Sequence, residues 1–112
     1  MIVHRNIWNW GRSDTIILAE GRAFCHVSIE NDVPGAAWLS GVSVYEPSRG
    51  KGLGNHLLQA AEENARERGA KTICLWANLN DWPIEWYKRK GYVFSRLNVE
   101  GGHMALLKKS LP

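Results

Sequence analysis

The first 45 residues alternate short apolar runs with polar and glycine-containing breaks. The apolar runs are rich in β-branched and aromatic residues, a pattern that predicts β-strands. Four strands are expected, over residues 3–10, 15–20, 23–30 and 37–45. Turn-forming residues separate the strands at 11–14, 21–22 and 31–35, and Pro47 ends the fourth.

Beyond Gly52 the period changes to that of a helix. Up to Arg68, small and aliphatic residues fall on one face and charged residues on the other, and Gly69 ends the segment. The apolar face comprises Leu53, Leu57, Leu58, Ala61 and Ala65. The apolar run 72–77 follows this helix as a short buried strand. Because one helix connects it to the preceding strand, we expect the two strands to pair in parallel.

A second helix and a hairpin are expected next. Asn80 or Asp81 is predicted as the N-cap with Pro83 in the first turn, and a basic run followed by Gly91 marks the helix end. The last strands are expected over residues 92–96 and 103–108, across a turn at 100–102. The order β-β-β-β-α-β-α-β-β predicts a mixed α/β (α+β) fold in a single domain, 1–112. This order of elements fits two arrangements equally well: one helix on each face of the sheet, or both helices on the same face.

The composition is that of an ordinary globular protein, with 45% hydrophobic and 22% charged residues. The net charge is +3 and the basic residues are scattered, so neither nucleic acid nor a membrane is expected as a partner. Cys25 and Cys74 have no Cys-x-x-Cys spacing, which argues against a metal site and against a disulfide framework. No run of 18 apolar residues occurs, and a cytoplasmic location is expected. The six tryptophans are expected in the core or as cleft walls.

The junction between the fourth strand and the first helix, residues 49–54, reads Arg-Gly-Lys-Gly-Leu-Gly. Where a helix begins, backbone N–H groups lack intrahelical partners and the dipole is positive, so a phosphate can bind if no side chain obstructs it. The glycines remove that obstruction. A P-loop is excluded because Leu53 and Asn55 follow the last two glycines, without the lysine and the hydroxyl that bind phosphate and magnesium. The Gly-x-Gly-x-x-Gly dinucleotide spacing is absent too.

A second segment, residues 80–92, reads Asn-Asp-Trp-Pro-Ile-Glu-Trp-Tyr-Lys-Arg-Lys-Gly-Tyr. Together with residues 49–54 it resembles motifs of the GNAT family of acetyl-CoA-dependent N-acetyltransferases. Arg49, Gly52 and Gly54 fill the family's Arg/Gln-x-x-Gly-x-Gly/Ala pattern. Residues 80–92 resemble its Asn-x-x-Ala-x-x-x-Tyr-x-x-x-Gly-Phe/Tyr pattern, with Pro83 in place of the alanine. The two segments also stand in the family's order.

The resemblance covers roughly residues 15–108 and implies that the fourth and fifth strands splay apart. Acetyl-CoA is the implied co-substrate, its pantetheine arm bonded to the main chain of Val42 and Val44. The implied pyrophosphate ligands are the amides of Gly50, Lys51, Gly52, Leu53, Gly54 and Asn55. Arg49 and Lys51 would add positive charge, although both are almost as well explained as solvated turn residues.

Tyr87 fills the family's tyrosine position, so the resemblance implies that it is the acid that protonates the leaving thiolate. A packed aromatic residue on a helix face is the alternative. Asn80 is implied to hydrogen-bond CoA, or it caps the helix. The implied reaction is direct transfer of acetyl to a primary amine of a small molecule or peptide, in a ternary complex.

The chain departs from the family at the general base. Leu75 stands where some members carry a glutamate. Glu30, Glu46, His26 and His103 are candidates, but each is better explained as a surface charge or a hydrogen-bonded strand histidine, and a chain of water molecules could replace a side-chain base. An α-amine, with a reference pKa of roughly 8, needs less help than lysine at about 10.4, which disfavours lysine as the acceptor.

A second departure is the short connection at residues 11–14, which leaves no room for the helices that usually wall the acceptor site. The acceptor side is therefore expected to be open or completed by a partner subunit, and we predict a homodimer. These departures keep a non-catalytic CoA-binding module as the alternative function. An anion- or RNA-binding protein is a weaker possibility.

Overall fold

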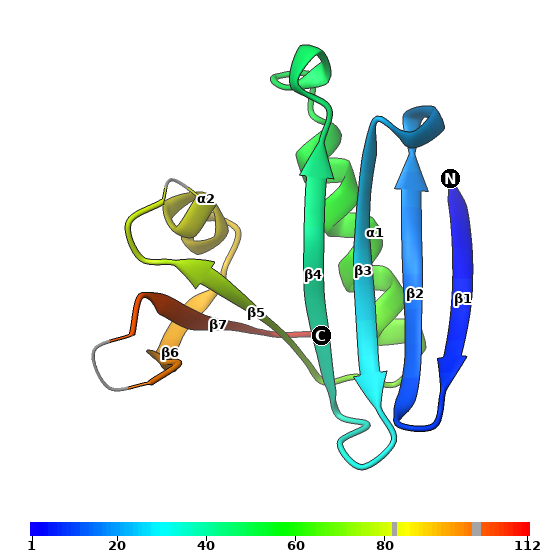
Figure 1. Ribbon diagram of the computed structural model, residues 1–112, viewed down its shortest axis with the longest axis vertical. Helices are drawn as coiled ribbons and strands as arrows, with labels where there is room; N and C mark the ends of the chain where they lie inside the picture. The colour runs from blue at the N-terminus through cyan, green and yellow to red at the C-terminus, as the bar shows by residue number, and fades with distance from the viewer. Residues whose placement is uncertain (82, 100–101) are drawn as a thin grey trace.

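The computed structural model describes residues 1–81, 83–99 and 102–112; Trp82 and the Glu100-Gly101 part of the predicted turn lie outside the described residues. The described chain forms a seven-stranded mixed sheet with two α-helices (Figure 1). The strands are β1 (Ile2–Trp8), β2 (Gly11–Leu18), β3 (Ala23–Glu30), β4 (Ala36–Val44), β5 (Thr72–Asn78), β6 (Val93–Leu97) and β7 (Met104–Ser110). The helices are α1 (Leu53–Glu67) and α2 (Pro83–Arg89), with 3₁₀ turns η1 (Ala19–Gly21) and η2 (Glu46–Ser48). The predicted element order and mixed α/β class are confirmed. In the described ranges, no helix has the length and apolarity needed to cross a membrane.

The sheet consists of two halves that separate along part of their length. Its strand order is β1-β2-β3-β4-β5-β7-β6, and every neighbouring pair is antiparallel except β4 and β5. The described β4–β5 pairing comprises Ala36 with Thr72, Ala37 with Ile73, and Trp38 with Cys74. Beyond Trp38 the two strands diverge, and Figure 1 shows β5 turning away from β4. The expected splay is confirmed.

Both helices pack on the same face of the sheet. The buried residues of α1 are Leu57, Leu58, Ala61 and Ala65, which match the predicted apolar face. Ile84 and Tyr87 of α2 belong to the same hydrophobic core as these residues and as Val27 of β3. In Figure 1, α1 lies behind β3 and β4. The structure thus resolves the two arrangements left open by the element order, and among the described residues no helix covers the opposite face of the sheet.

The first hairpin turns earlier than its sequence pattern indicated. β1 ends at Trp8 and β2 begins at Gly11, so the prediction of a turn at residues 11–14 was wrong. Gly11 lies against the backbone of Ile29 and Glu30, where a Cβ would find no space, which explains a glycine inside a strand. The two-residue connection confirms that no helix stands between the first two strands.

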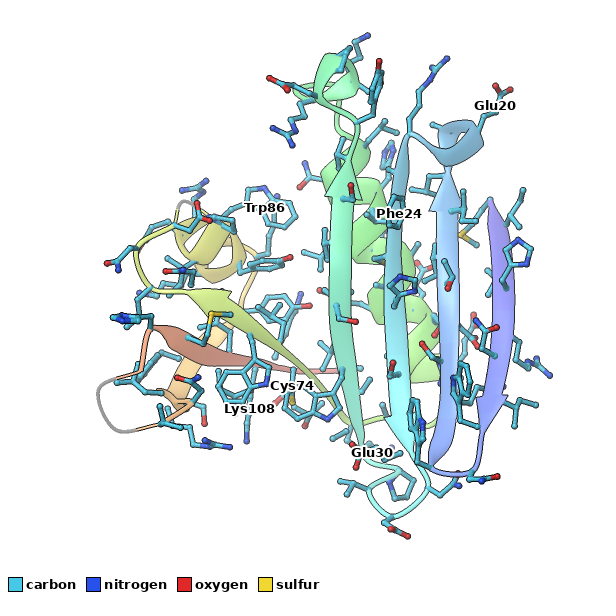
Figure 2. The ribbon with its side chains drawn as sticks, viewed as in Figure 1. Glu20, Phe24, Glu30, Cys74, Trp86 and Lys108 are labelled. Atoms are coloured by element: carbon cyan, nitrogen blue, oxygen red, sulfur yellow. The ribbon has the colours of Figure 1, made fainter. Side chains whose placement is uncertain are left out.

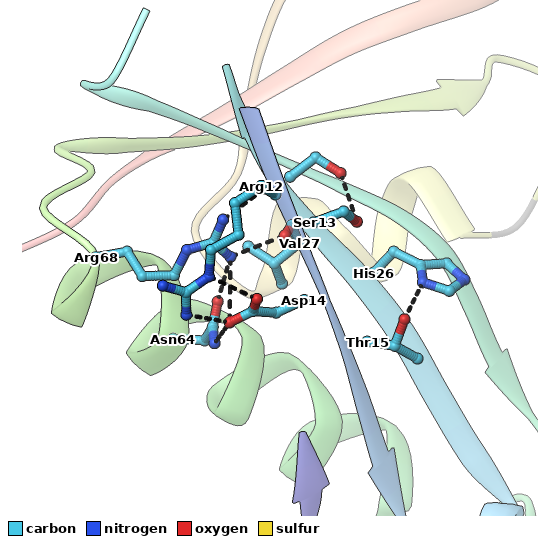
Figure 3. A network of polar contacts seen from close by, with 9 residues as sticks. Arg12, Ser13, Asp14, Thr15, His26, Val27, Asn64 and Arg68 are labelled. Atoms are coloured by element: carbon cyan, nitrogen blue, oxygen red, sulfur yellow. Dashed lines mark hydrogen bonds and ion pairs between the residues drawn. The ribbon is translucent and has the colours of Figure 1, made fainter. Parts of the chain in front are cut away.

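A buried acid fastens α1 to β2 and β3 (Figure 3). Asp14 is fully buried, and its Oδ2 accepts hydrogen bonds from Arg12 Nη2 at 2.7 Å and Asn64 Nδ2 at 2.9 Å. Arg68 Nη1 lies 3.6 Å from the same oxygen and donates to the Val27 carbonyl at 2.9 Å. Burial alone would raise the pKa of Asp14, but the hydrogen bonds and the two cations outweigh burial and hold the pKa below its ordinary value.

A second polar contact ties α1 to the other half of the sheet. The Tyr92 hydroxyl donates to Glu62 Oε2 and Lys109 Nζ donates to Glu62 Oε1, each at 2.9 Å. Glu62 lies on α1 and Lys109 on β7, so the helix bridges both halves across the splay.

The tryptophans lie differently from the expectation. None of the five described tryptophans is buried, and Trp8 and Trp10 are 53% and 47% exposed. Trp38 and Trp76 stack with ring centroids 6.2 Å apart where β4 and β5 meet. Trp86 walls the cleft described below, as predicted, and Trp8 and Trp10 line a hollow on the other face of the sheet. Trp8, Trp10, Trp38 and Trp76 are not in the core because the helices cover one face of the sheet and leave the face with these rings open.

Candidate functional site

A cleft of about 460 Å³ opens where β4 and β5 separate. Its walls are the end of β4, the glycine turn, the start of α1, and α2. The lining residues are Val42, Ser43, Val44, Ser48, Arg49, Gly50, Gly52, Leu53, Gly54, Asn55, Pro83, Trp86 and Tyr87. Nine of the eleven residues predicted from the sequence therefore lie together, and Lys51 and Asn80 are absent from the described lining.

The β4 wall is shaped by a bulge. Phe24 of β3 is opposite Ser43, and His26 is opposite Ser40, so three steps along β4 match two along β3. Gly41 lies inside the bulge with φ +60°, which favours glycine. Beyond the bulge β4 has β3 on one side and no described strand on the other. Alternate backbone N–H and C=O groups of this edge face the cleft, where the Val44 carbonyl already accepts a hydrogen bond from Arg49 and the neighbouring groups are open to a partner.

The glycine turn presents main-chain amides at the opposite wall. Gly50 and Gly52 both have φ +81°, and no atom lies within 4 Å of where a Cβ would stand on either. α1 begins at Leu53 without a side-chain cap, and the His56 N–H is the first to reach a carbonyl, that of Gly52, at 3.1 Å. The amides at the helix start are therefore available to an anion, in a site with positive dipole.

The two basic residues of the turn differ in position. Arg49 Nε donates to the Val44 carbonyl at 3.1 Å, which holds the guanidinium beside the end of β4 at the cleft. Lys51 is exposed and does not line the cleft, so its solvated turn position matches the simpler of its two expected roles.

Tyr87 contributes a phenol to the cleft from α2. The side chain is 7% exposed and makes edge-to-face contacts with Trp86 and Tyr92 at centroid distances of 5.0 and 5.5 Å. Burial, together with the nearby Cys25 thiol, raises the pKa of Tyr87 to about 12. The hydroxyl therefore stays protonated throughout the neutral range and can donate a hydrogen bond or a proton.

Asn80 lies outside the cleft. It is exposed in the turn after β5, where its N–H donates to the Asn78 side chain at 2.9 Å. Trp86 was expected only in general terms, as a core or cleft-wall tryptophan, and was not named among the site residues; Figure 2 shows it pointing from α2 toward β4. The signal in the sequence was its position beside Tyr87. In the structure Trp86 faces a small residue, since a Cβ on Gly54 would lie 3.6 Å from the Trp86 ring.

The four candidate bases lie in different surroundings, and none is among the described residues of the cleft lining. Glu30, Glu46 and His103 are exposed, at the end of β3, in η2 and before β7. His26 is half-buried on the uncovered face of the sheet, and its Nδ1 lies 2.8 Å from Thr15 Oγ1. Both free thiols are buried, and burial raises the pKa of Cys25 to about 12, which excludes it as a thiolate near neutrality.

Comparison with known proteins accounts for this geometry. The model of the acetyltransferase (GNAT) family matches residues 5–92. The chain belongs to the GNAT family. Among GNAT proteins, streptothricin acetyltransferase of Streptomyces lavendulae is 34% identical over 92 residues, which cover 71% of this chain and 49% of that protein. The chain thus spans about half the length of this relative.

Solved GNAT structures share the fold. Nourseothricin acetyltransferase superposes with a TM-score of 0.73 at 24% identity, covering 93% of this chain and 67% of that one. N-acetylglutamate synthase of Neisseria gonorrhoeae, solved with coenzyme A and N-acetylglutamate, gives a TM-score of 0.72 at 13% identity, covering 89% and 26%. At these identities the likeness shows the GNAT fold.

Proposed function

We propose that this chain is an N-acetyltransferase that moves an acetyl group from acetyl-CoA directly to a primary amine in a ternary complex. The observation that carries the proposal is the cleft itself. It joins an open strand edge, a helix start with free amides, and a protonated tyrosine. Family membership supports acetyl-CoA as the acetyl donor. The arrangement of the walls supports an orientation with the extended arm of the cofactor along β4 and its pyrophosphate at the start of α1.

The residues present fit CoA. The open edge of β4 at Val42 and Val44 offers main-chain groups for an extended amide-containing arm, in the manner of an added strand. The turn from Gly50 to the start of α1 offers amides for a pyrophosphate, and the Arg49 guanidinium adds positive charge. The cleft volume of about 460 Å³ lies in the usual range for ligand pockets.

Acetyl-CoA supplies a thioester carbonyl that an amine can attack. As the C–N bond forms, negative charge develops on the carbonyl oxygen, and main-chain N–H groups near the β4 bulge would stabilise it. Tyr87 then donates its proton, or a hydrogen bond, to the sulfur that leaves. Because its pKa of about 12 exceeds that of an ordinary thiol at roughly 8.5, complete transfer of the proton to a free thiolate is uphill. Tyr87 would therefore act first as a hydrogen-bond donor to the sulfur as the C–S bond breaks, and transfer of its proton would need the phenol to regain a proton from the attacking nitrogen.

A small-molecule acceptor is favoured over a peptide. The relative at 34% identity is named for streptothricin, a small molecule. The alternative function, a CoA-binding module without catalysis, is favoured by the absence of a carboxylate or imidazole from the described cleft lining.

Two measurements test the proposal. Calorimetric titration with CoA should show saturable binding, and no binding at millimolar CoA would contradict both the enzyme and the binding module. Thiol release from acetyl-CoA is then measured with a panel of small amines. Amine-dependent release identifies an enzyme, whereas CoA binding without release from any amine identifies the module.

We also propose a homodimer formed through β1. This strand is an edge of the sheet, and Ile2, Ile7 and Trp8 on it are 55%, 75% and 53% exposed. The other edge, β6, carries an irregularity between Phe94 and Arg96 that blunts it. β1 pairs regularly along its whole length, so two copies can continue one sheet across a twofold axis.

A further inference from the structure

The uncovered face of the sheet carries a polar row that the cofactor cleft does not use. Thr15 is in register with His26, and His26 with Ser40, so β2, β3 and β4 present these side chains side by side. One step along, Ser28 Oγ donates to Ser13 Oγ at 3.0 Å. Figure 3 shows Thr15 and His26 on the opposite side of β2 and β3 from the buried Asp14. A hollow of about 440 Å³ lies over this row.

His26 connects this hollow with the cofactor cleft. A Cβ added to Gly41 would lie 2.7 Å from His26 Cδ2 and 3.3 Å from Nε2, so the imidazole rests against the bulge of β4. The next residue, Val42, lines the cleft. The other ring nitrogen, Nδ1, is 2.8 Å from Thr15 Oγ1. With Nδ1–H donating to Thr15, Nε2 is left as a hydrogen-bond acceptor beside the bulge.

The walls of the hollow define the chemistry of its ligand. Hydroxyl groups and the amide of Asn6 line it, and the rings of Trp8 and Trp10 stand nearly parallel, at 7°, with centroids 6.4 Å apart. Hydroxyl and amide groups exchange hydrogen bonds with the hydroxyls of a ligand, while an indole face packs against its C–H groups. No carboxylate is among the described residues that line the hollow. A polycationic ligand would find no counter-charge in the hollow. A ligand with an uncharged, hydroxyl-bearing ring therefore fits the hollow better than a polycation does.

We propose that this hollow binds the acceptor, an amine carried on a polyhydroxylated ring, and that His26 accepts the proton of its ammonium group. The inference rests on the proposed acetyl transfer. The ammonium gives one proton to His26 Nε2, and its nitrogen then forms the C–N bond as the C–S bond breaks. The sulfur keeps the electron pair of that bond and receives a proton from Tyr87, and the second proton lost by nitrogen restores the phenol. The products are the N-acetyl amine and CoA thiol, with His26 protonated.

The acceptor class is tested by comparing three probes, glucosamine, cyclohexylamine and spermidine, in acetyl-CoA thiol release. Glucosamine should have a kcat/KM at least about tenfold above the other two, because hydroxyl groups paired in a built site discriminate strongly against analogues that lack them. Saturation-transfer NMR on glucosamine gives a readout independent of activity. It should show binding to the native protein and a loss of at least about fivefold in affinity in Trp8→Ala, since an aromatic contact is lost.

His26→Asn tests the proton acceptor. It should lower kcat with glucosamine at least about tenfold while leaving the CoA affinity from calorimetry unchanged, since general base catalysis contributes 10² or more. His4→Asn is the matched control, because His4 is exposed on β1, in the same cross-strand row but outside the hollow. It should leave both values unchanged.

The outcomes separate this inference from the proposed function. Absence of CoA binding sinks the proposed acetyl transfer, whereas the NMR experiment still reports on the hollow. If glucosamine shows no saturation transfer, or if Trp8→Ala leaves its binding intact, the hollow is not the acceptor site. If His26→Asn turns over at the native rate, His26 does not take the proton.

Discussion

Burial keeps the phenol of Tyr87 protonated, and this residue gives the most direct test of catalysis. Tyr87→Phe removes the proton donor while preserving the ring contacts with Trp86 and Tyr92. We expect CoA affinity to stay within about twofold and kcat to fall about 10²-fold, the usual contribution of a positioned acid. Thiol-release kinetics and calorimetry measure the two values.

Tyr45→Phe is the control for this variant, because Tyr45 is 60% exposed and lies outside the cleft lining. A Tyr87→Phe enzyme that turns over at the native rate would remove Tyr87 from the acid role. Because its pKa is about 12, Tyr87 should add no titration to the rate between pH 6 and 10.

Gly52 permits a second test on the scale of one residue. Its φ of +81° strains any other residue, so Gly52→Ala should lower the free energy of unfolding by about 1 kcal/mol. Its methyl group would also stand at the cleft, where CoA affinity should fall about tenfold, an approximate cost of 1.4 kcal/mol.

Gly69→Ala is matched to it, because Gly69 has φ +92° with nothing within 4 Å, beyond the far end of α1. It should lose similar stability in urea unfolding but keep its CoA affinity in calorimetry. Equal affinities in the two variants would contradict the assignment of the glycine turn to the cofactor.

At the scale of elements, the attachment of α1 depends on Asp14. Asp14→Asn leaves the Arg68 side chain, 9% exposed, without its nearest counter-charge and should cost about 3 kcal/mol of unfolding free energy at pH 7. Because the pKa of Asp14 is lowered in the folded state, its stabilisation is present above the unfolded pKa, near 3.9, and is lost as pH falls through the folded pKa.

Urea unfolding should therefore show a difference in unfolding free energy between the native protein and Asp14→Asn at pH 7, and this difference should become smaller below about pH 4. Asp32→Asn, in an exposed turn, should follow the native protein at every pH. A difference in unfolding free energy that stays constant with pH would show that the charge of Asp14 does not stabilise the fold.

Much of the element order was predictable, because periodicity and turn residues are local signals. The helical period from Gly52 and the glycines at the strand-to-helix junction predicted α1 and most of the cleft. The position of Gly11 inside a strand was not predictable. A glycine is needed there because the backbone of Ile29, which is distant in the sequence, leaves no space for a Cβ. The position of Asn80 relative to the cleft was not predictable for a similar reason. Its spacing from Tyr87 is a property of the chain, whereas its distance from the cleft depends on the turn after β5.

On the scale of the whole molecule, burial of a side chain depends on which face the helices cover. The sequence left open whether the two helices share a face, and this one unknown decides the exposure of Trp8, Trp10 and Trp76. The surroundings of the candidate bases were not predictable for the same reason, since those of His26 follow from the bulge and from the bare face of the sheet.

The proposed dimer is tested at this scale. Sedimentation at micromolar concentration should give a dimer, and Ile7→Lys, which places a charge on the edge of β1, should shift it toward monomer. Val93→Lys is the control, because Val93 is 66% exposed on the opposite edge. A native protein that sediments as a monomer would contradict the dimer.

The short pairing between β4 and β5 means that the width of the cleft depends on how the two halves of the sheet are joined. The described strand pairing between the two halves consists of three residue pairs at one end, and α1 braces them through Glu62 with Tyr92 and Lys109. We therefore expect the angle between the halves to depend on these two connections, neither of which contributes a residue to the described lining of the cleft. A substitution at either place should then change the width of the cleft without altering any residue described as lining it.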